Sequence, residues 1–137
     1  MVNGTDYQVV LDRMTNEEAK DHCANGVFHG SSSGKLFEPK DRQIYEQVVQ
    51  NVNRIANEQR RSDLRLWVGI ERNQGSNRFQ YMTSGDALVS GVVTVQSSDV
   101  LGDYDDDLNN CVEYQTLSGD VKVVDCAFRR TAICEAV

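Results

Sequence analysis

The residues with the clearest chemical potential are acids and amides that gather in one polar stretch late in the chain. They are Asp99, Asp103, Asp105, Asp106, Asp107, Asn109 and Asn110. Carboxylate, amide and backbone oxygens are the ligands that Ca²⁺ prefers, and the ion takes about six to eight of them. The stretch is therefore a candidate calcium site, with Asp103, Asp105, Asp106 and Asp107 as metal ligands, although the spacing differs from that of an EF-hand loop. The alternative interpretation is a solvated acidic turn that binds no metal.

Other residues give little support to catalysis. His22 and His29 are the only histidines, and neither has a partner at the spacing of a zinc site or a catalytic triad. The segment 30–36 has too few residues between its glycines for a phosphate-binding loop. Tyr104 is the single aromatic residue of the acidic stretch, where it could stack on a sugar, anchor a protein partner or be buried as a loop anchor. We expect no enzymatic activity.

The four cysteines, Cys23, Cys111, Cys126 and Cys134, indicate disulfides and an oxidising compartment, so we expect a secreted, extracellular protein. Their placement favours nested bridges, Cys23 to Cys134 and Cys111 to Cys126, although the residues alone leave the other pairings open. The outer bridge would close almost the whole chain, which in the chain-entropy model stabilises the fold by about 4 to 5 kcal/mol. Because residues 1–5 lack the layout of a secretory signal, we expect that a signal was removed. Asn3 begins a glycosylation sequon.

Length and charge narrow the classes of partner. The 137 residues predict one domain spanning 1–137, with its core at about 7–135. The formal net charge of −7 opposes binding to nucleic acid or to anionic lipid, where affinity comes from Lys and Arg. No apolar run approaches the length of a bilayer crossing, so we expect no membrane insertion.

The periodicity of the chain predicts two helices followed by a run of strands. A capping box at Thr15 and Glu18 begins the first helix, and apolar residues at spacings of three and four from Ile44 to Ala56 indicate the second. The predicted strands are 7–11, 35–38, 66–70, 79–82, 92–95, 111–114, 121–124 and 131–134. This order is typical of an α+β fold with an antiparallel sheet.

The order of elements and motifs resembles the C-type lectin-like domain in its short form. The resemblance rests on Thr15–Lys20 leading to Cys23, on Trp67–Ile70, on the cysteine order and on the terminal Ile133–Glu135, and it spans Tyr7 to Glu135. It implies a double-loop fold in which two helices flank antiparallel sheets, the terminal strands lie side by side, and two disulfides form the nested pairs. It also implies that Trp67 and Gly69 are core residues.

In the family, a long central loop carries the binding site, and sugar-binding members hold calcium with three groups of ligands. A Glu-Pro-Asn or Gln-Pro-Asp tripeptide here becomes Leu101–Asp103, or Ser97–Asp99 if the alignment slides. A Glu before the third cysteine becomes Asn109, and an Asn-Asp pair before the fourth becomes Lys122 and Val123. A lysine ammonium repels a divalent cation and valine offers no ligand atom, so the usual calcium and sugar site is incomplete.

The sequence therefore predicts a secreted, non-enzymatic recognition module whose partner is a glycan or glycoprotein. The binding surface is expected to comprise the loop 92–110 and the strands 113–124, with calcium as a candidate cofactor in an incomplete or relocated site. The predicted ligand-binding residues are Asp99, Asp103, Tyr104, Asn109, Glu113 and Lys122. The alternative is a protein-binding, structural or adhesion module that keeps the fold without calcium-dependent sugar binding.

Overall fold

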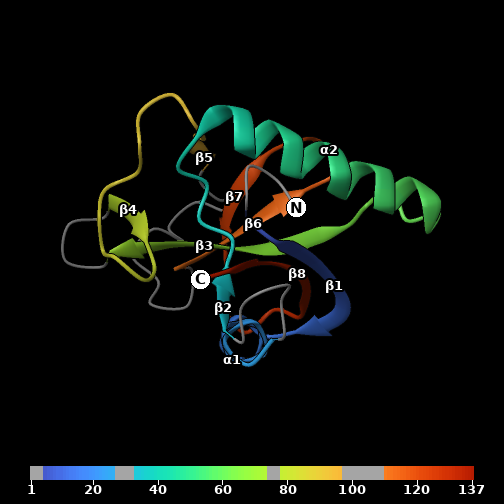
Figure 1. The fold of residues 1–137 in the computed structure, drawn as a ribbon, viewed down its shortest axis with the longest axis horizontal. Coiled ribbons are helices and arrows are strands. Elements are labelled where there is room, and N and C mark those ends of the chain that lie inside the picture. Colours follow the sequence, from blue (N-terminus) through green and yellow to red (C-terminus); the bar gives the residue numbers. More distant parts are fainter. Residues whose placement is uncertain (1–4, 27–32, 74–77, 97–109) are drawn as a thin grey trace.

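The computed structural model describes residues 5–26, 33–73, 78–96 and 110–137, which form two helices and a mixed β-sheet. Figure 1 shows one helix on each side of the sheet. The elements are β1 (Tyr7–Met14), α1 (Asn16–Ala24), β2 (Gly34–Leu36), α2 (Arg42–Glu58), β3 (Arg65–Asn73), β4 (Arg78–Tyr81), β5 (Val95–Gln96), β6 (Cys111–Gln115), β7 (Val121–Val124) and β8 (Arg130–Ala136). No helix among the described residues is both long and apolar enough to cross a bilayer.

Both helices begin at side-chain caps. The Thr15 hydroxyl accepts a hydrogen bond from the Glu18 amide, and the Glu18 carboxylate accepts one from the Thr15 amide at 2.9 Å, which confirms the predicted capping box of α1. Asp41 caps α2 by accepting from the Ile44 amide at 3.0 Å. The buried stripe of α2 is Tyr45, Val48, Val52 and Ala56.

The sheet has the order β1-β8-β3-β6-β7-β5, with β2 added beside β8 and β4 beside β3. The terminal strands pair antiparallel from Tyr7 with Glu135, as predicted. Two pairs differ from the expected antiparallel sheet, because β3 runs parallel to β8 and β5 runs parallel to β7. Strand β8, the last of the chain, lies between β1 and β3. It therefore pairs with the first strand of the chain and with a strand from its middle.

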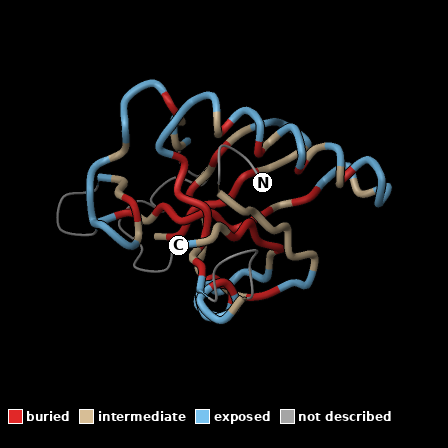
Figure 2. The backbone as a smooth tube through the Cα atoms, in the orientation of Figure 1, coloured by how far each residue is buried: buried red, intermediate tan, exposed pale blue. Residues whose placement is uncertain are grey.

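The sheet separates two apolar cores. Leu66, Val68 and Ile70 of β3 pack in the core beneath α2, whereas Trp67 packs with Ala19 of α1 on the other face. Figure 2 shows the buried residues concentrated in the sheet and along the inner sides of the helices. Trp67 is 0% exposed, and its indole nitrogen donates a hydrogen bond to the Met14 carbonyl at 2.8 Å.

All four cysteines form the two nested disulfides. Cys23 of α1 is bonded to Cys134 of β8, and Cys111 of β6 is bonded to Cys126, just after β7. The outer bridge fastens α1 to the sheet on the face that holds Trp67. The inner bridge connects the start of β6 to the residues just after β7. In the sequence, the acidic stretch ends directly before β6.

Candidate functional site

Most of the predicted site residues lie outside the described part of the chain. They are Asp99, Asp103, Tyr104, Asp105, Asp106, Asp107 and Asn109. The roles assigned to these residues therefore stay predictions. The described residues that flank them are Gln96 at the end of β5 and Asn110 next to β6, and these two positions mark where the acidic segment leaves and rejoins the sheet.

A buried arginine fixes the point at which the segment rejoins the sheet. The Arg72 amide donates to the Asn110 carbonyl at 2.9 Å, and the Arg72 Nε donates to the Asn110 Oδ1 at 3.1 Å. Arg72 is only 6% exposed, so its guanidinium is held in a defined position. The sequence analysis missed Arg72, because an arginine at the end of a strand is usually exposed.

A hollow of about 560 Å³ lies beside this point, between the start of α1, the end of β3 and the Cys111–Cys126 disulfide. Its lining is mixed, because Met82, Ala127 and the disulfide add apolar surface, and we call it the polar hollow after its charged and amide side chains. Its polar side chains include Glu17 and Lys20 of α1, Glu71 of β3, and Asn110 and Asp125. Carboxylates and amide oxygens accept hydrogen bonds, whereas Lys20 and the Asn110 amide donate them. This mixture suits a ligand with several hydroxyl groups, each of which both donates and accepts.

One lining residue of this hollow has a buried donor without a partner. Asn16 is 3% exposed, and its Nδ2 makes no hydrogen bond within the described part of the protein. The backbone N–H of Asn16, by contrast, donates to the Cys126 carbonyl at 3.1 Å, which ties the first residue of α1 to the inner disulfide. An unpaired buried donor costs about 1–3 kcal/mol, so Asn16 is a local weak point beneath the hollow. The sequence indicated Asn16 only as the start of a helix.

The structure does not fit the prediction that Glu113 contacts a ligand. Its side chain is 0% exposed on β6, where Oε1 accepts from the Arg130 Nε at 2.8 Å and Oε2 accepts from the Gln115 Nε2 at 2.9 Å. The Arg65 Nε lies 3.9 Å from Oε2. A buried carboxylate is stabilised by paired cations and hydrogen bonds, so Glu113 is an internal charge that organises two arginines.

Strand β7 also fails to provide the family's calcium ligands. Lys122 is half-buried and pairs in register with Glu113, while Val123 is buried. Neither side chain carries an oxygen, so these positions do not fit a calcium ion. Within residues 5–26, 33–73, 78–96 and 110–137, no three His, Cys, Asp or Glu side chains gather into a metal site.

One comparison with known proteins identifies a family. The family model described as "Lectin C-type domain" matches residues 12–136. Among curated protein sequences, none matches the chain. Human lithostathine superposes with a TM-score of 0.70 at 22% identity, covering 99% of this chain and 94% of that one. The C-type lectin CEL-I from Cucumaria echinata gives a TM-score of 0.74 at 14% identity, with 100% and 93% covered.

A third similar structure is the calcium-free form of a Ca²⁺-dependent type II antifreeze protein. It has a TM-score of 0.70 at 16% identity, and the match covers 100% of this chain and 95% of that one. At such low identities these three likenesses concern the fold alone. The chain therefore shares its fold with proteins described as a lectin and as an antifreeze protein.

Proposed function

Because the chain belongs to the C-type lectin domain family, we propose that it is a secreted, single-domain recognition module that binds a glycan or glycoconjugate. C-type lectin-like domains are in general binding modules rather than enzymes. The family match over residues 12–136 supports one domain across the chain. The proposed surface comprises the acidic segment and the hollow beside Asn110.

The polar hollow is the observation that carries the proposal. It is lined by Asn110, which in the sequence directly follows the acidic segment that the family resemblance makes the binding loop. Glu17, Lys20 and Glu71 offer acceptors and a donor in its lining. Sugar hydroxyls complement such a set, because each needs both kinds of partner.

A glycan array, run once with calcium and once with chelator, tests the proposal. We expect Glu17→Ala and Lys20→Ala to weaken binding of the best array ligand about 5- to 10-fold, as the loss of one charged hydrogen bond predicts. Glu58→Ala, on an exposed turn of α2 away from the hollow, is the matched control and should leave affinity unchanged. An array with no bound glycan under either condition would remove the proposal.

Calcium belongs to the proposal only at the acidic segment. C-type lectin domains often bind calcium, and Asp103, Asp105, Asp106 and Asp107 offer the oxygens that the ion prefers. We expect millimolar calcium to raise the melting temperature, and Asp103→Ala to reduce that rise without unfolding the domain. A melting temperature unchanged by calcium and by chelator would show that the segment is a solvated acidic turn.

The second candidate function is a protein-binding or adhesion module, and β7 is the observation that favours it. Lys122 and Val123 replace the family's oxygen ligands, so sugar binding through a metal at that position is lost. A protein partner would be distinguished by binding that persists in chelator and that enzymatic removal of the partner's glycans does not weaken.

A further inference from the structure

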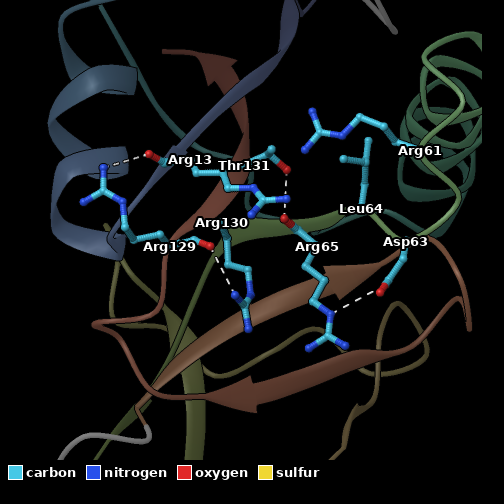
Figure 3. Close-up of a pocket in the computed structure, with 8 residues that line it drawn as sticks. All are labelled: Arg13, Arg61, Asp63, Leu64, Arg65, Arg129, Arg130 and Thr131. Atoms are coloured by element: carbon cyan, nitrogen blue, oxygen red, sulfur yellow. Dashed lines mark hydrogen bonds and ion pairs between the residues drawn. The ribbon is translucent and has the colours of Figure 1, made fainter.

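Arginine side chains converge on a second hollow, of about 160 Å³. Figure 3 shows the side chains that line it, which come from the end of β1, the segment after α2 and the starts of β3 and β8. The lining residues are Arg13, Arg61, Asp63, Leu64, Arg65, Arg129, Arg130 and Thr131. Five of the eight are arginines, in a protein whose formal net charge is −7. We refer to this hollow as the arginine pocket.

Three of these arginines are held by acids. Arg130 and Arg65 flank the buried Glu113 at 2.8 and 3.9 Å, and Arg65 also lies 3.6 Å from Asp63. Arg129 lies 3.4 Å from Glu18 of α1. Together these three cations face three anions, so this part of the pocket has no excess charge.

The other two arginines, Arg13 and Arg61, supply the excess positive charge of the pocket. Within the described residues, no acid pairs with the guanidinium of Arg13 or of Arg61. Figure 3 shows the Arg61 side chain extending from the end of α2 toward Arg13 and Thr131. Both residues line the same pocket of about 160 Å³ without a paired acid, so an anion bound there would meet uncompensated positive charge.

Two walls of the pocket are tied to the backbone. The Arg129 Nη2 donates to the Arg13 carbonyl at 3.1 Å, and the Arg130 Nη1 donates to the Arg129 carbonyl at 3.1 Å. These bonds orient Arg129 and Arg130, whereas the Arg13 and Arg61 guanidinium groups stay available to a ligand. The pocket and the polar hollow share no lining residue, and on β3 the pocket is lined by Arg65 at the start and the hollow by Glu71 near the other end.

We propose that the arginine pocket binds an oxyanion carried by a sugar, either a sulfate ester or a carboxylate. A guanidinium is planar and matches the oxygens of both groups through paired hydrogen bonds. The net charge of −7 disfavours an extended polyanion, since the rest of the surface would repel it, so the ligand is a short glycan with a single acidic group.

A neighbouring aromatic ring favours a sugar as the carrier. Phe128 is 46% exposed, and the Arg130 guanidinium lies 4.9 Å from the centroid of its ring. Arg130 lies over the ring, and the part of Phe128 that stays exposed offers apolar surface to a sugar ring while the arginines hold its acidic substituent. The sugar part of this inference rests on the proposed glycan-binding function, whereas the oxyanion part rests on the pocket alone.

Side-chain NMR tests the inference directly. ¹H–¹⁵N spectra of the arginine Nε–H groups would be followed while adding a sulfated trisaccharide, its sialylated counterpart, the uncharged parent trisaccharide and sodium sulfate, all in chelator. We expect the Arg13 and Arg61 signals to shift with an acidic trisaccharide, at an affinity at least about tenfold above that of the parent. The sulfated and sialylated arms show which acidic group the pocket prefers.

Substitutions at matched charge separate a specific pocket from general attraction. Arg13→Ala, Arg61→Ala and the control Arg54→Ala each change the net charge from −7 to −8. The first two should weaken binding of the acidic trisaccharide about 5- to 10-fold, and the control, an exposed α2 residue paired with Glu58, should leave it within about twofold. Equal losses in all three variants would overturn the inference.

Two further outcomes are decisive. Binding of inorganic sulfate without either acidic trisaccharide would show that the pocket holds only an adventitious ion, and would overturn the inference. Binding of an acidic trisaccharide in chelator, by a protein that binds no neutral glycan on the array, would support the pocket while removing the proposed function of the polar hollow.

Discussion

At the scale of single residues, the sequence motifs predicted core residues correctly, but they did not predict the role of a buried charged residue. Trp67 and Gly69 were predicted as core residues, and both are buried. A Cβ at Gly69 would lie 2.6 Å from the Leu36 carbonyl oxygen, so glycine is needed for the close approach of β2 to β3. Glu113, by contrast, was predicted to bind a ligand, because its position in a strand does not reveal the arginines that other strands bring beside it.

The internal role of Glu113 leads to a prediction for Glu113→Gln. The variant leaves Arg130 and Arg65 without their shared carboxylate, and breaking a buried ion pair costs about 3–5 kcal/mol. Since both arginines are partly exposed, we expect a smaller loss of about 2–3 kcal/mol in the free energy of unfolding, measured by urea denaturation.

Glu58→Gln provides the control for this prediction. It removes an exposed ion pair with Arg54 on α2 and should leave the free energy of unfolding unchanged within error. If Glu113→Gln were equally neutral but weakened glycan binding, Glu113 would be a ligand contact as the sequence first indicated.

At the scale of elements, the sequence predicted what depends on local pattern. The capping box at Thr15, the apolar stripe of α2 and the strand 111–114 are all present, because each is encoded by residues a few positions apart. The parallel pairing of β3 with β8 was not predictable, since nothing local distinguishes a parallel from an antiparallel partner. The polar hollow was missed for a related reason, because the fold brings its acids and amides together from separate segments.

The segment after β2 is joined to the turn after β4 by the buried carboxylate of Glu38. This carboxylate accepts from the Thr83 amide at 2.8 Å and from the Thr83 hydroxyl, and Lys35 lies 3.0 Å away. Burial alone would raise the pKa of Glu38, but the hydrogen bonds from Thr83 and Lys35 outweigh it and lower the pKa below the usual 4.5. Nearby, burial raises the pKa of Glu135, which accepts from the Glu38 amide.

These opposite shifts predict opposite pH dependences. A lowered pKa means that Glu38 stabilises the fold above about pH 4.5 and that this contribution is lost as the pH falls through the folded-state value. Glu38→Gln should therefore be less stable than the parent protein at pH 7, by about 2 kcal/mol, with the difference shrinking below about pH 4.5. Urea denaturation across this pH range measures the difference.

Glu135→Gln should behave in the reverse sense. A raised pKa means that the protonated form stabilises the fold and that this contribution is lost as the pH rises through the folded-state value. The variant should be at least as stable as the parent protein at pH 7.

A different result for Glu38→Gln would contradict the first of these predictions. A deficit in stability that stayed constant from pH 7 to pH 3 would show that the Glu38 contribution is packing rather than charge.

At the scale of the whole molecule, the sheet lies between two apolar cores, and the outer disulfide connects the N-terminal helix to the C-terminal strand. The outer bridge joins α1 to β8 across 111 positions of sequence, whereas the inner bridge spans 15. The nested pairing was favoured by cysteine placement and implied by the family resemblance, and it is confirmed. Charge is also organised at this scale, since a protein of net charge −7 keeps an arginine-rich pocket at one end of β3 and a mixed polar hollow near the other.

The two bridges should therefore differ in what their removal changes. In the chain-entropy model a bridge stabilises by restricting the unfolded chain, so removing Cys23–Cys134 as a double serine variant should cost about 4–5 kcal/mol, and removing Cys111–Cys126 about 3 kcal/mol. The inner bridge also lines the polar hollow, so its removal should weaken glycan binding more than its effect on stability predicts. Denaturant titration and glycan binding, measured on both variants, separate the two effects.

An inner-bridge variant that bound glycan as tightly as the parent protein would contradict this prediction. The hollow would then keep its shape without the disulfide, because the hydrogen bonds of Asn16 and Arg72 would hold its walls.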